Sequence, residues 1–302
     1  MTMPTAAGSP VSGVTTPRLR VADITLRFGG LTALHDVHFE VFPGELFAII
    51  GPNGAGKTSI FNCINGVYRP NVGSITLDGQ SLLDCKPWQT AQRGVARTFQ
   101  NLALFSHLSV IDNVMLGRHL QMRGGFVGCG TGMWGLMDRW TYGWRVRRRP
   151  RSSHSAFRRM NDAHSEVLHR RRCAEVLDLL ALGPYRALPV GILPYGVQKR
   201  VDLARALVME PRLLLLDEPV AGMNNEETEA MAKAVLEVQA EMHLSTVLVE
   251  HDMHLVMAVA DRVMALDFGV PIMTGTPEAV RQDPMVIAAY LGASNALAQE
   301  ER

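Results

Sequence analysis

The chain has 302 residues, of which 47% are hydrophobic and 20% charged, so it can build a sizeable core and is not a disordered chain. Its formal net charge of +1 excludes a uniformly basic protein that binds polyanions along its whole length. No apolar run reaches the roughly 18 residues that a membrane-spanning helix needs. Residues 1–17 lack the basic start and apolar run of a signal peptide. They are small, polar and Pro-containing, so we expect a disordered tail there.

The cysteines point to a reducing compartment. Cys63, Cys85, Cys129 and Cys173 are widely spaced and form no C-x-x-C pair. Neither a zinc site nor a disulfide framework is therefore indicated, and we expect free thiols in a cytoplasm.

The first hundred residues predict strands and one helix. Period-two alternation of apolar residues predicts strands over 19–26 and 37–41, and the continuous apolar run 46–50 predicts a buried strand. A helix is expected over 57–67, followed by a strand over 74–77 that ends at an Asp78-Gly79 turn. After residue 100 the apolar pattern becomes helical over about 110–116.

The second half of the chain begins with helices and ends with alternating strands and helices. Helices are expected over 167–182 and 198–209. Strands follow at 213–216 and 246–249, each with a helix after it (228–242 and 253–260), and then strands at 263–266 and 270–273. This order predicts an α/β core interrupted by a helical insertion.

Residues 51–58 carry the strongest chemical signal. They fill every fixed position of the pattern G-x-x-x-x-G-K-[ST], between an apolar strand and a helix. Glycines let several backbone N–H groups point at one phosphate, and the helix that follows adds its positive end. The predicted nucleotide-binding residues are Gly51, Pro52, Asn53, Gly54, Ala55, Gly56, Lys57, Thr58 and Ser59.

An acidic pair follows the apolar strand 213–216. That strand ends in Asp217 and Glu218, which a buried strand can deliver to a Mg²⁺ ion and to an attacking water. A lone pair of acids at a strand end is often only a helix-capping feature. About 160 residues after a phosphate-loop lysine, it predicts the second half of an ATP site.

Further motifs, in the same order and spacing, resemble the ATP-binding subunits of ABC transporters over about residues 18–292. Residues 193–198 (the signature segment, Leu-Pro-Tyr-Gly-Val-Gln) stand where that family has L-S-G-G-Q. Gln100 matches its Q-loop, residues 221–224 its D-loop, and His251 its switch histidine. Phe28 stands where the family stacks an aromatic ring on adenine.

The resemblance implies roles for these residues. Lys57, Thr58, Asp217 and Mg²⁺ hold the phosphates of ATP, with Gln100 as a further Mg²⁺ or water ligand. Glu218 acts as the base and His251 orders the γ-phosphate. Leu193, Pro194, Tyr195 and Gly196 contact the nucleotide of a second ATPase subunit, placed head to tail. Pro194 replaces the family's serine and Val197 its polar residue, so backbone N–H groups near Gly196 are left to bind the phosphate.

The implied architecture is a RecA-like P-loop ATPase core with an N-terminal antiparallel β portion and an inserted helical subdomain. We expect the core over 18–100 and 205–292, the helical subdomain over 101–204, and a C-terminal tail over 293–302. Between about 120 and 165 the subdomain carries an unusual insertion rich in Gly, Trp and Arg.

The resemblance narrows to one subfamily, the ATPases of high-affinity branched-chain amino-acid importers. Residues 194–196, 218–224, 250–253 and the ending 289–292 carry it. It implies two transmembrane permeases, a second ATPase (identical or paralogous), an indirectly coupled solute-binding protein, and a peripheral place on the cytoplasmic membrane face. The open alternatives are uptake of urea, amides or other amino acids, lipid export, and a soluble ABC ATPase without transport.

The basic insertion leaves three interpretations open. Residues 118–172 hold thirteen arginines and three acids, so the rest of the chain is acidic. The segment is either a solvated loop or an arm on the cytoplasmic lipid surface, where anionic headgroups attract Arg and Trp rings settle at the interface. Nucleic-acid binding is disfavoured because the rest of the chain is acidic.

Overall fold

The computed structural model describes residues 16–100, 102–121 and 153–290, and over 153–165 it describes the backbone alone. The chain forms two compact units. The first comprises residues up to 95 together with 212–218 and 238 onward, and the second comprises 96–211 and 219–237. Most of the predicted N-terminal tail, the C-terminal tail and most of the basic insertion lie outside the described residues.

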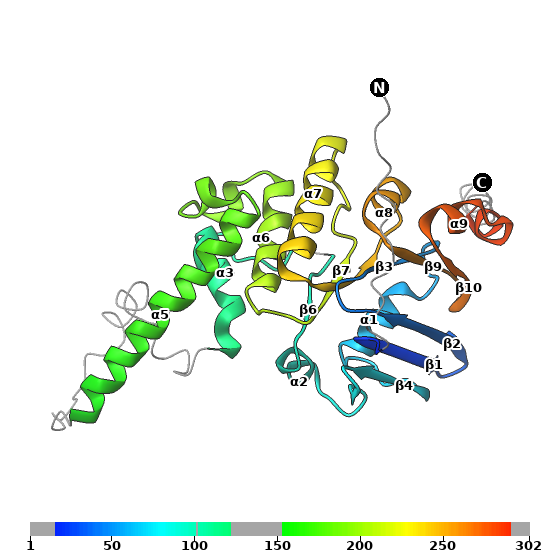
Figure 1. Cartoon of the computed structure of the whole chain (residues 1–302), viewed down its shortest axis with the longest axis horizontal. Helices are drawn as coiled ribbons and strands as arrows, with labels where there is room; N and C mark the ends of the chain where they lie inside the picture. The colour runs from blue at the N-terminus through cyan, green and yellow to red at the C-terminus, as the bar shows by residue number, and fades with distance from the viewer. Residues whose placement is uncertain (1–15, 101, 122–152, 291–302) are drawn as a thin grey trace. The chain divides into compact units, whose positions relative to one another are not determined.

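An antiparallel sheet in the first unit contains the N-terminal strands, as the sequence predicts. Its strands lie in the order β2-β1-β4-β5, and Figure 1 shows β1, β2 and β4 side by side. Asp78 and Gly79 make the β4–β5 turn with φ values of 46° and 76°, a conformation that turn residues of these types tolerate. The strands are β1 (Leu19–Phe28), β2 (Leu31–Val41), β4 (Val72–Leu77) and β5 (Gln80–Ser81).

A second sheet of six strands has the order β10-β9-β3-β8-β7-β6. Strands β7, β8, β3 and β9 are parallel, and β10 is antiparallel to β9. Every residue of β3, β7 and β8 is buried, which explains why their sequences are continuous apolar runs without alternation. The strands are β3 (Leu46–Ile50), β6 (Val95–Arg97), β7 (Leu213–Asp217), β8 (Ser245–Val249), β9 (Arg262–Asp267) and β10 (Val270–Gly275).

Short helices connect the strands of the first unit or, in the case of α9, follow the last one. Helix α8 begins where the Asp252 side chain accepts hydrogen bonds from the N–H groups of His254 (2.8 Å) and Leu255 (3.2 Å). The Thr276 hydroxyl caps α9 in the same way. The helices are α1 (Lys57–Ile64), α2 (Pro87–Gln92), α8 (Met253–Val259) and α9 (Pro277–Gln282).

One hydrophobic core fills the first unit. It combines the inner faces of both sheets with α1, for example Ile24, Phe61 and Leu215, all of which are fully buried. The rings of Phe39 and Phe47 stack with their centroids 5.1 Å apart and an interplanar angle of 4°, which joins the two sheets. This shared core fixes the strand ends that carry the functional residues.

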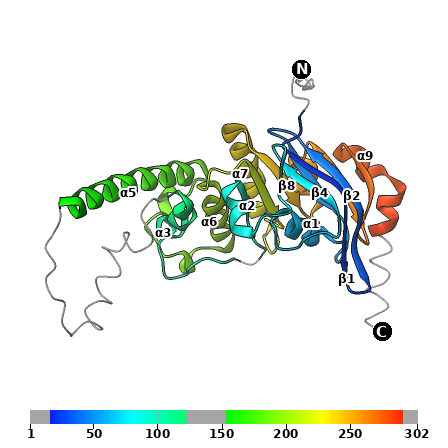
Figure 2. The same ribbon diagram turned by 90° about the horizontal axis from the view of Figure 1, so that it is seen from below.

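The second unit is helical. Figure 2 shows α3 beside α5 and α6, and these three helices contact one another. Val176, Leu177 and Cys173 of α5 are buried, and the Cys173 Sγ lies 3.5 Å from the Met115 Sδ. The elements are α3 (Val110–Met115), η1 (Leu116–Leu120), α5 (Ser153–Leu179), η2 (Gly183–Tyr185), η3 (Val190–Ile192), α6 (Tyr195–Leu207) and the first part of α7 (Asn225–Met242).

A buried arginine organises polar contacts within this unit. Arg118 is 7% exposed, donates from Nη1 to the Val208 carbonyl (2.7 Å), and pairs with the Glu210 carboxylate at 3.1 Å. Its Nε donates to Nδ1 of His169 at 3.2 Å. Burial lowers the pKa of His169, and the nearby Arg118 charge lowers it further. His169 is therefore held as a neutral acceptor.

The predicted strands and helices are confirmed, with shifted ends. Strand β2 begins at Leu31, and α6 begins at Tyr195, three residues before its predicted start. Helices α2 and α9 and strands β5 and β6 were not predicted. Within the residues that the structure describes, no helix is both long enough and apolar enough to cross a membrane. The described cysteines Cys63, Cys85 and Cys173 are free thiols, as expected, and all three are buried.

Candidate functional site

The phosphate loop (residues 51–58) can adopt its path only with glycine at two positions. A Cβ on Gly51, which has φ 153°, would lie 2.1 Å from the Leu266 carbonyl oxygen. A Cβ on Gly56, with φ 103°, would lie 2.9 Å from the Ala33 carbonyl oxygen. The loop is thus pressed between β9 and β2, and its glycines permit that packing as well as its curvature.

Lys57 is a buried lysine that lies near three carboxylates of the first unit. Its side chain is 6% exposed, and Nζ donates to the carbonyl oxygens of Gly51 (2.6 Å) and Pro52 (3.0 Å). Burial lowers the pKa of Lys57, whereas the charges of Glu218, Glu250 and Asp217 raise it, in that order of size. The lysine therefore lies among three carboxylates.

The outer side of the phosphate loop is open. Asn53, Gly54 and Thr58 are exposed, although Gly51, Ala55 and Lys57 are buried. The N–H groups of the first turn of α1 have no partner within the helix, and that turn contains no acidic residue. Together with the lysine, they form a positively polarised cradle suited to a phosphate.

The acids of β7 stand at the end of a fully buried strand. Asp217 is 5% exposed. Glu218 follows with φ 46°, its N–H donates to the Val249 carbonyl at 2.9 Å, and its side chain is 16% exposed. A left-handed conformation at a residue other than glycine is a strained one that is frequent at functional sites. Here it turns the chain just after Asp217.

The first unit's site contains a third acid, Glu250, for which the sequence indicated no role. Glu250 follows β8 and is 0% exposed, and its Oε2 accepts hydrogen bonds from the N–H groups of His251 (2.9 Å) and Asp252 (3.3 Å). Nδ1 of His251 lies 3.6 Å from Oε2 of Glu250 and 3.9 Å from Oε1 of Glu218. The sequence could have indicated Glu250 by its position, because it follows the apolar run of β8 just as Asp217 and Glu218 follow the apolar run of β7.

The donor set in the first unit fits a magnesium ion. Thr58 offers a hydroxyl and Asp217 a carboxylate, and oxygen ligands of these kinds are the ones Mg²⁺ prefers. Three carboxylates near one lysine repel a polyphosphate that carries no metal ion, so the site favours a polyphosphate bound to a cation.

Phe28 lies at the exposed end of β1 and is 45% exposed. The edge of the Tyr68 ring meets it, with the centroids 5.1 Å apart and an interplanar angle of 76°. Tyr68 is partly buried against the core, so Phe28 is the exposed ring of the pair and the one available for stacking on a base. The role of Phe28 toward adenine stays a prediction, and Tyr68 is a neighbour that the sequence did not indicate.

Tyr290 connects the C-terminal segment to the phosphate loop. Burial raises the pKa of its phenol, and a hydrogen bond with the Gly51 backbone opposes that shift. The tyrosine therefore braces the first residue of the loop.

The signature segment (residues 193–198) lies in the second unit, at the start of α6. Leu193 is buried, and Pro194 occupies the N-cap position without a side-chain hydrogen bond. Tyr195, 41% exposed, and Gly196 belong to the first helical turn. The Gly196 N–H, expected to be available to a phosphate, donates to Oε1 of Glu227 at 3.1 Å.

Helix α6 also holds the segment around Gln100, which is exposed. Lys199 Nζ donates to the Gln100 carbonyl at 2.8 Å. Asp202 accepts the Phe99 N–H; burial raises the pKa of this carboxyl, while Arg205 and the Phe99 bond lower it. Lys199 and Asp202 were not predicted, because nothing in the sequence indicates contacts across some hundred residues.

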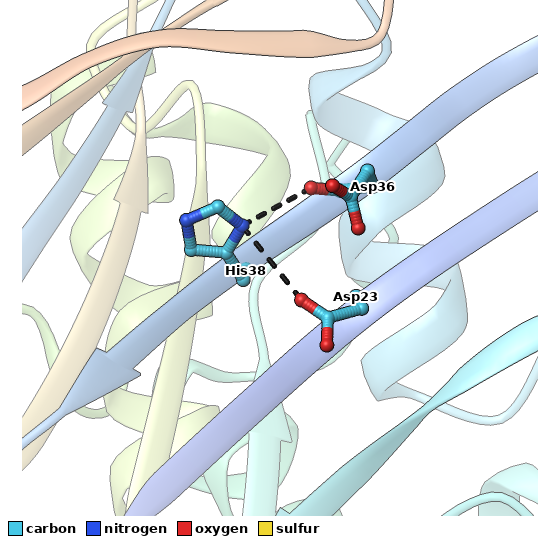
Figure 3. Close-up of side chains that lie close together, drawn as sticks. All are labelled: Asp23, Asp36 and His38. Carbon is cyan, nitrogen blue, oxygen red and sulfur yellow. Dashed lines mark hydrogen bonds and ion pairs between the residues drawn. The ribbon is translucent and has the colours of Figure 1, made fainter.

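A separate cluster of Asp23, Asp36 and His38 lies on the β1–β2 hairpin (Figure 3). Nδ1 of His38 lies 3.2 Å from the Asp36 carbonyl oxygen and 3.9 Å from Oδ1 of Asp23. All three residues are exposed, and exposed acids often cluster without binding a metal. We interpret His38 as a structural residue of the hairpin.

A glycine-rich loop between a parallel strand and a helix, with acids at the ends of neighbouring parallel strands, defines a P-loop nucleotide-binding protein. Comparisons with known proteins agree. Residues 34–221 match the ABC transporter family, and residues 271–295 match the branched-chain amino acid ATP-binding cassette transporter family. The chain therefore belongs to the ABC transporter ATP-binding family, and it is an ABC ATPase.

Individual relatives are similar along most of their length. The high-affinity branched-chain amino acid transport ATP-binding protein LivG of Escherichia coli K12 is 38% identical, covering 91% of this chain and 98% of LivG. BraF of Pseudomonas aeruginosa, of the same description, is 36% identical over the same shares of each chain. The ADP conformation of MJ1267, an ATP-binding cassette of an ABC transporter, shares the fold with a TM-score of 0.72 and 24% identity, covering 92% of this chain and all of MJ1267.

Proposed function

We propose that the chain is the ATP-hydrolysing subunit of a branched-chain amino-acid importer and acts through membrane permeases from the cytoplasmic face. The similarity of the C-terminal segment 271–295 to the branched-chain family supports this cargo. A sulfate/thiosulfate import ATP-binding protein of Rhodopseudomonas palustris is only 30% identical, against 38% for LivG. A second ATPase and a solute-binding protein complete the proposed complex.

The proposed mechanism starts at the phosphate loop. Its N–H groups and Lys57 bind the β- and γ-phosphates, and closing on them requires Lys57 to exchange its bonds to the Gly51 and Pro52 carbonyls for phosphate oxygens. Thr58 and Asp217, with Gln100, are the proposed ligands of Mg²⁺. When bound with ATP, Mg²⁺ neutralises phosphate charge.

Glu218 is the proposed base. Its carboxylate is only 16% exposed and lies beside Lys57, where it can accept a proton from the attacking water. His251, 54% exposed and 3.9 Å from that carboxylate, can order both the water and the γ-phosphate. The buried Glu250 positions His251 through its backbone N–H.

The observation that carries the proposal is Lys57 among Asp217, Glu218 and Glu250 at the edge of the parallel sheet. In the variant Glu218→Gln we expect ATP binding and ATP-dependent dimerisation, with turnover reduced at least about 100-fold because the base is lost. Glu278→Gln, in the first turn of α9, is the matched control and keeps wild-type turnover. Turnover by Glu218→Gln above a tenth of wild type contradicts the assignment.

A further inference from the structure

The signature segment opens α6 without a cap of its own. Pro194 at the N-cap has neither a hydroxyl nor a hydrogen-bonded side chain, and the first turn contains no acidic residue. The N–H groups at a helix start carry partial positive charge and need acceptors. An acceptor has to come from elsewhere in the second unit.

Glu227 supplies that acceptor from the first turn of α7. Oε1 accepts the Gly196 N–H at 3.1 Å, and Oε2 accepts the Asn224 N–H at 3.2 Å. The Asn224 side chain in turn accepts the Glu227 N–H at 2.9 Å, which makes a capping box at the start of α7. One half-buried carboxylate therefore caps two helices at once.

The approach of this carboxylate requires glycine at position 196. A Cβ there would lie 2.7 Å from Oε1 and 2.9 Å from Cδ of Glu227. The missing Cβ thus lets an anion reach the N-terminus of α6. In this conformation the anion is the protein's own carboxylate.

We propose that Glu227 is an internal competitor for the γ-phosphate, which sets how much ATP is needed to close two ATPase subunits. The inference rests on the proposed function, in which the γ-phosphate bound at Lys57 of one copy meets the Gly196 N–H of a second copy. Glu227 must release that N–H, or share it with the phosphate, before the copies close. Since carboxylate and phosphate are both anions, keeping them together is costly.

The test uses charge removal that preserves the cap. Glutamine retains a carbonyl acceptor and suits the same capping-box position, so Glu227→Gln removes the charge but keeps the helix start. It is made in the full-length Glu218→Gln chain, and the Mg-ATP concentration for half-maximal dimerisation is measured by analytical ultracentrifugation. Glu226→Gln, an exposed neighbour in the same helical turn, is the matched control.

We expect Glu227→Gln to lower the half-maximal ATP concentration about tenfold at low salt. This reduction in the ATP requirement becomes smaller as ionic strength rises, because salt screens the repulsion between the Glu227 carboxylate and the γ-phosphate. A cap with a purely structural role would not produce this salt dependence. Glu226→Gln leaves the concentration within about twofold of the parent, as expected for an exposed charge.

Three results overturn the proposal. An ATP requirement that is unchanged in both Glu227→Gln and Glu227→Ala means that the carboxylate does not oppose closure, and a raised requirement in Glu227→Gln means that it only positions the signature segment. Glu227→Ala removes the cap and the charge together, so it covers the case in which the glutamine side chain takes up a different position. If the parent Glu218→Gln chain dimerises with ATP neither with itself nor with the second ATPase that copurifies with it, the proposed function fails as well.

Discussion

The three glycines of the phosphate loop that have positive φ predict a graded series of alanine variants. At Gly54 (φ 81°) no atom lies within 4 Å of an added Cβ, so Gly54→Ala costs only the left-handed conformation, about 1 kcal/mol. At Gly56 the added Cβ meets Ala33 and Leu34 atoms at 2.9 Å, which raises the cost to about 2–3 kcal/mol. At Gly51 the 2.1 Å approach to a backbone carbonyl forces the loop to move, at about 4 kcal/mol or more.

Thermal unfolding of the nucleotide-free chain, followed by circular dichroism, measures the series. In a chain of this length, each kcal/mol of destabilisation lowers Tm by about 2 °C. The series therefore predicts decreases in Tm of about 2 °C for Gly54→Ala, about 5 °C for Gly56→Ala and about 8 °C for Gly51→Ala. Gly79→Ala is the matched control, because it has φ 76° and open space but lies in the β4–β5 turn. If Gly51→Ala is no more destabilised than Gly54→Ala, the packing argument for the loop is refuted.

Two further predictions concern the second unit. Because burial holds the pKa of His169 below 6.5, the unfolded chain binds a proton that the folded chain excludes. The free energy of unfolding therefore falls as the pH drops below about 6.5. Urea titrations at pH 7.5 and 5.5 should show a smaller decrease in this free energy for His169→Gln than for the wild type. Equal decreases contradict the assignment. Lys199→Met keeps the aliphatic stem but removes the hydrogen bond to the Gln100 carbonyl. We expect it to lower the free energy of unfolding by about 1 kcal/mol and to increase hydrogen exchange of the neighbouring Phe99 amide. Unchanged exchange of that amide contradicts the contact.

Contiguous motifs made the first unit's site predictable. The phosphate loop needs only residues 51–58 and their flanks, and the pair Asp217 and Glu218 is marked by the apolar run before it. The buried parallel strands were equally clear, because strands covered on both faces are continuous apolar runs. Local sequence was sufficient wherever the determinants lay within one segment.

The missed features depend on contacts between distant segments. Strand β2 starts at Leu31 because hairpin pairing with β1 extends it through exposed residues that show no apolar alternation. The Glu227 contact with Gly196 spans 31 positions, and the Lys199 contact with Gln100 spans 99. Only the folded helix packing brings such residues together, so propensity and periodicity do not reveal them.

The most direct test of the account is ATP turnover by this chain, reconstituted in liposomes with the permeases and second ATPase that copurify with it from its own membranes. Leucine-loaded solute-binding protein should raise turnover several-fold, and Glu218→Gln should abolish that stimulation, in line with the loss of a general base. Binding protein loaded with urea or sulfate should not stimulate. ATP turnover that does not change with branched-chain amino acids, or stimulation that is retained in Glu218→Gln, would contradict the account.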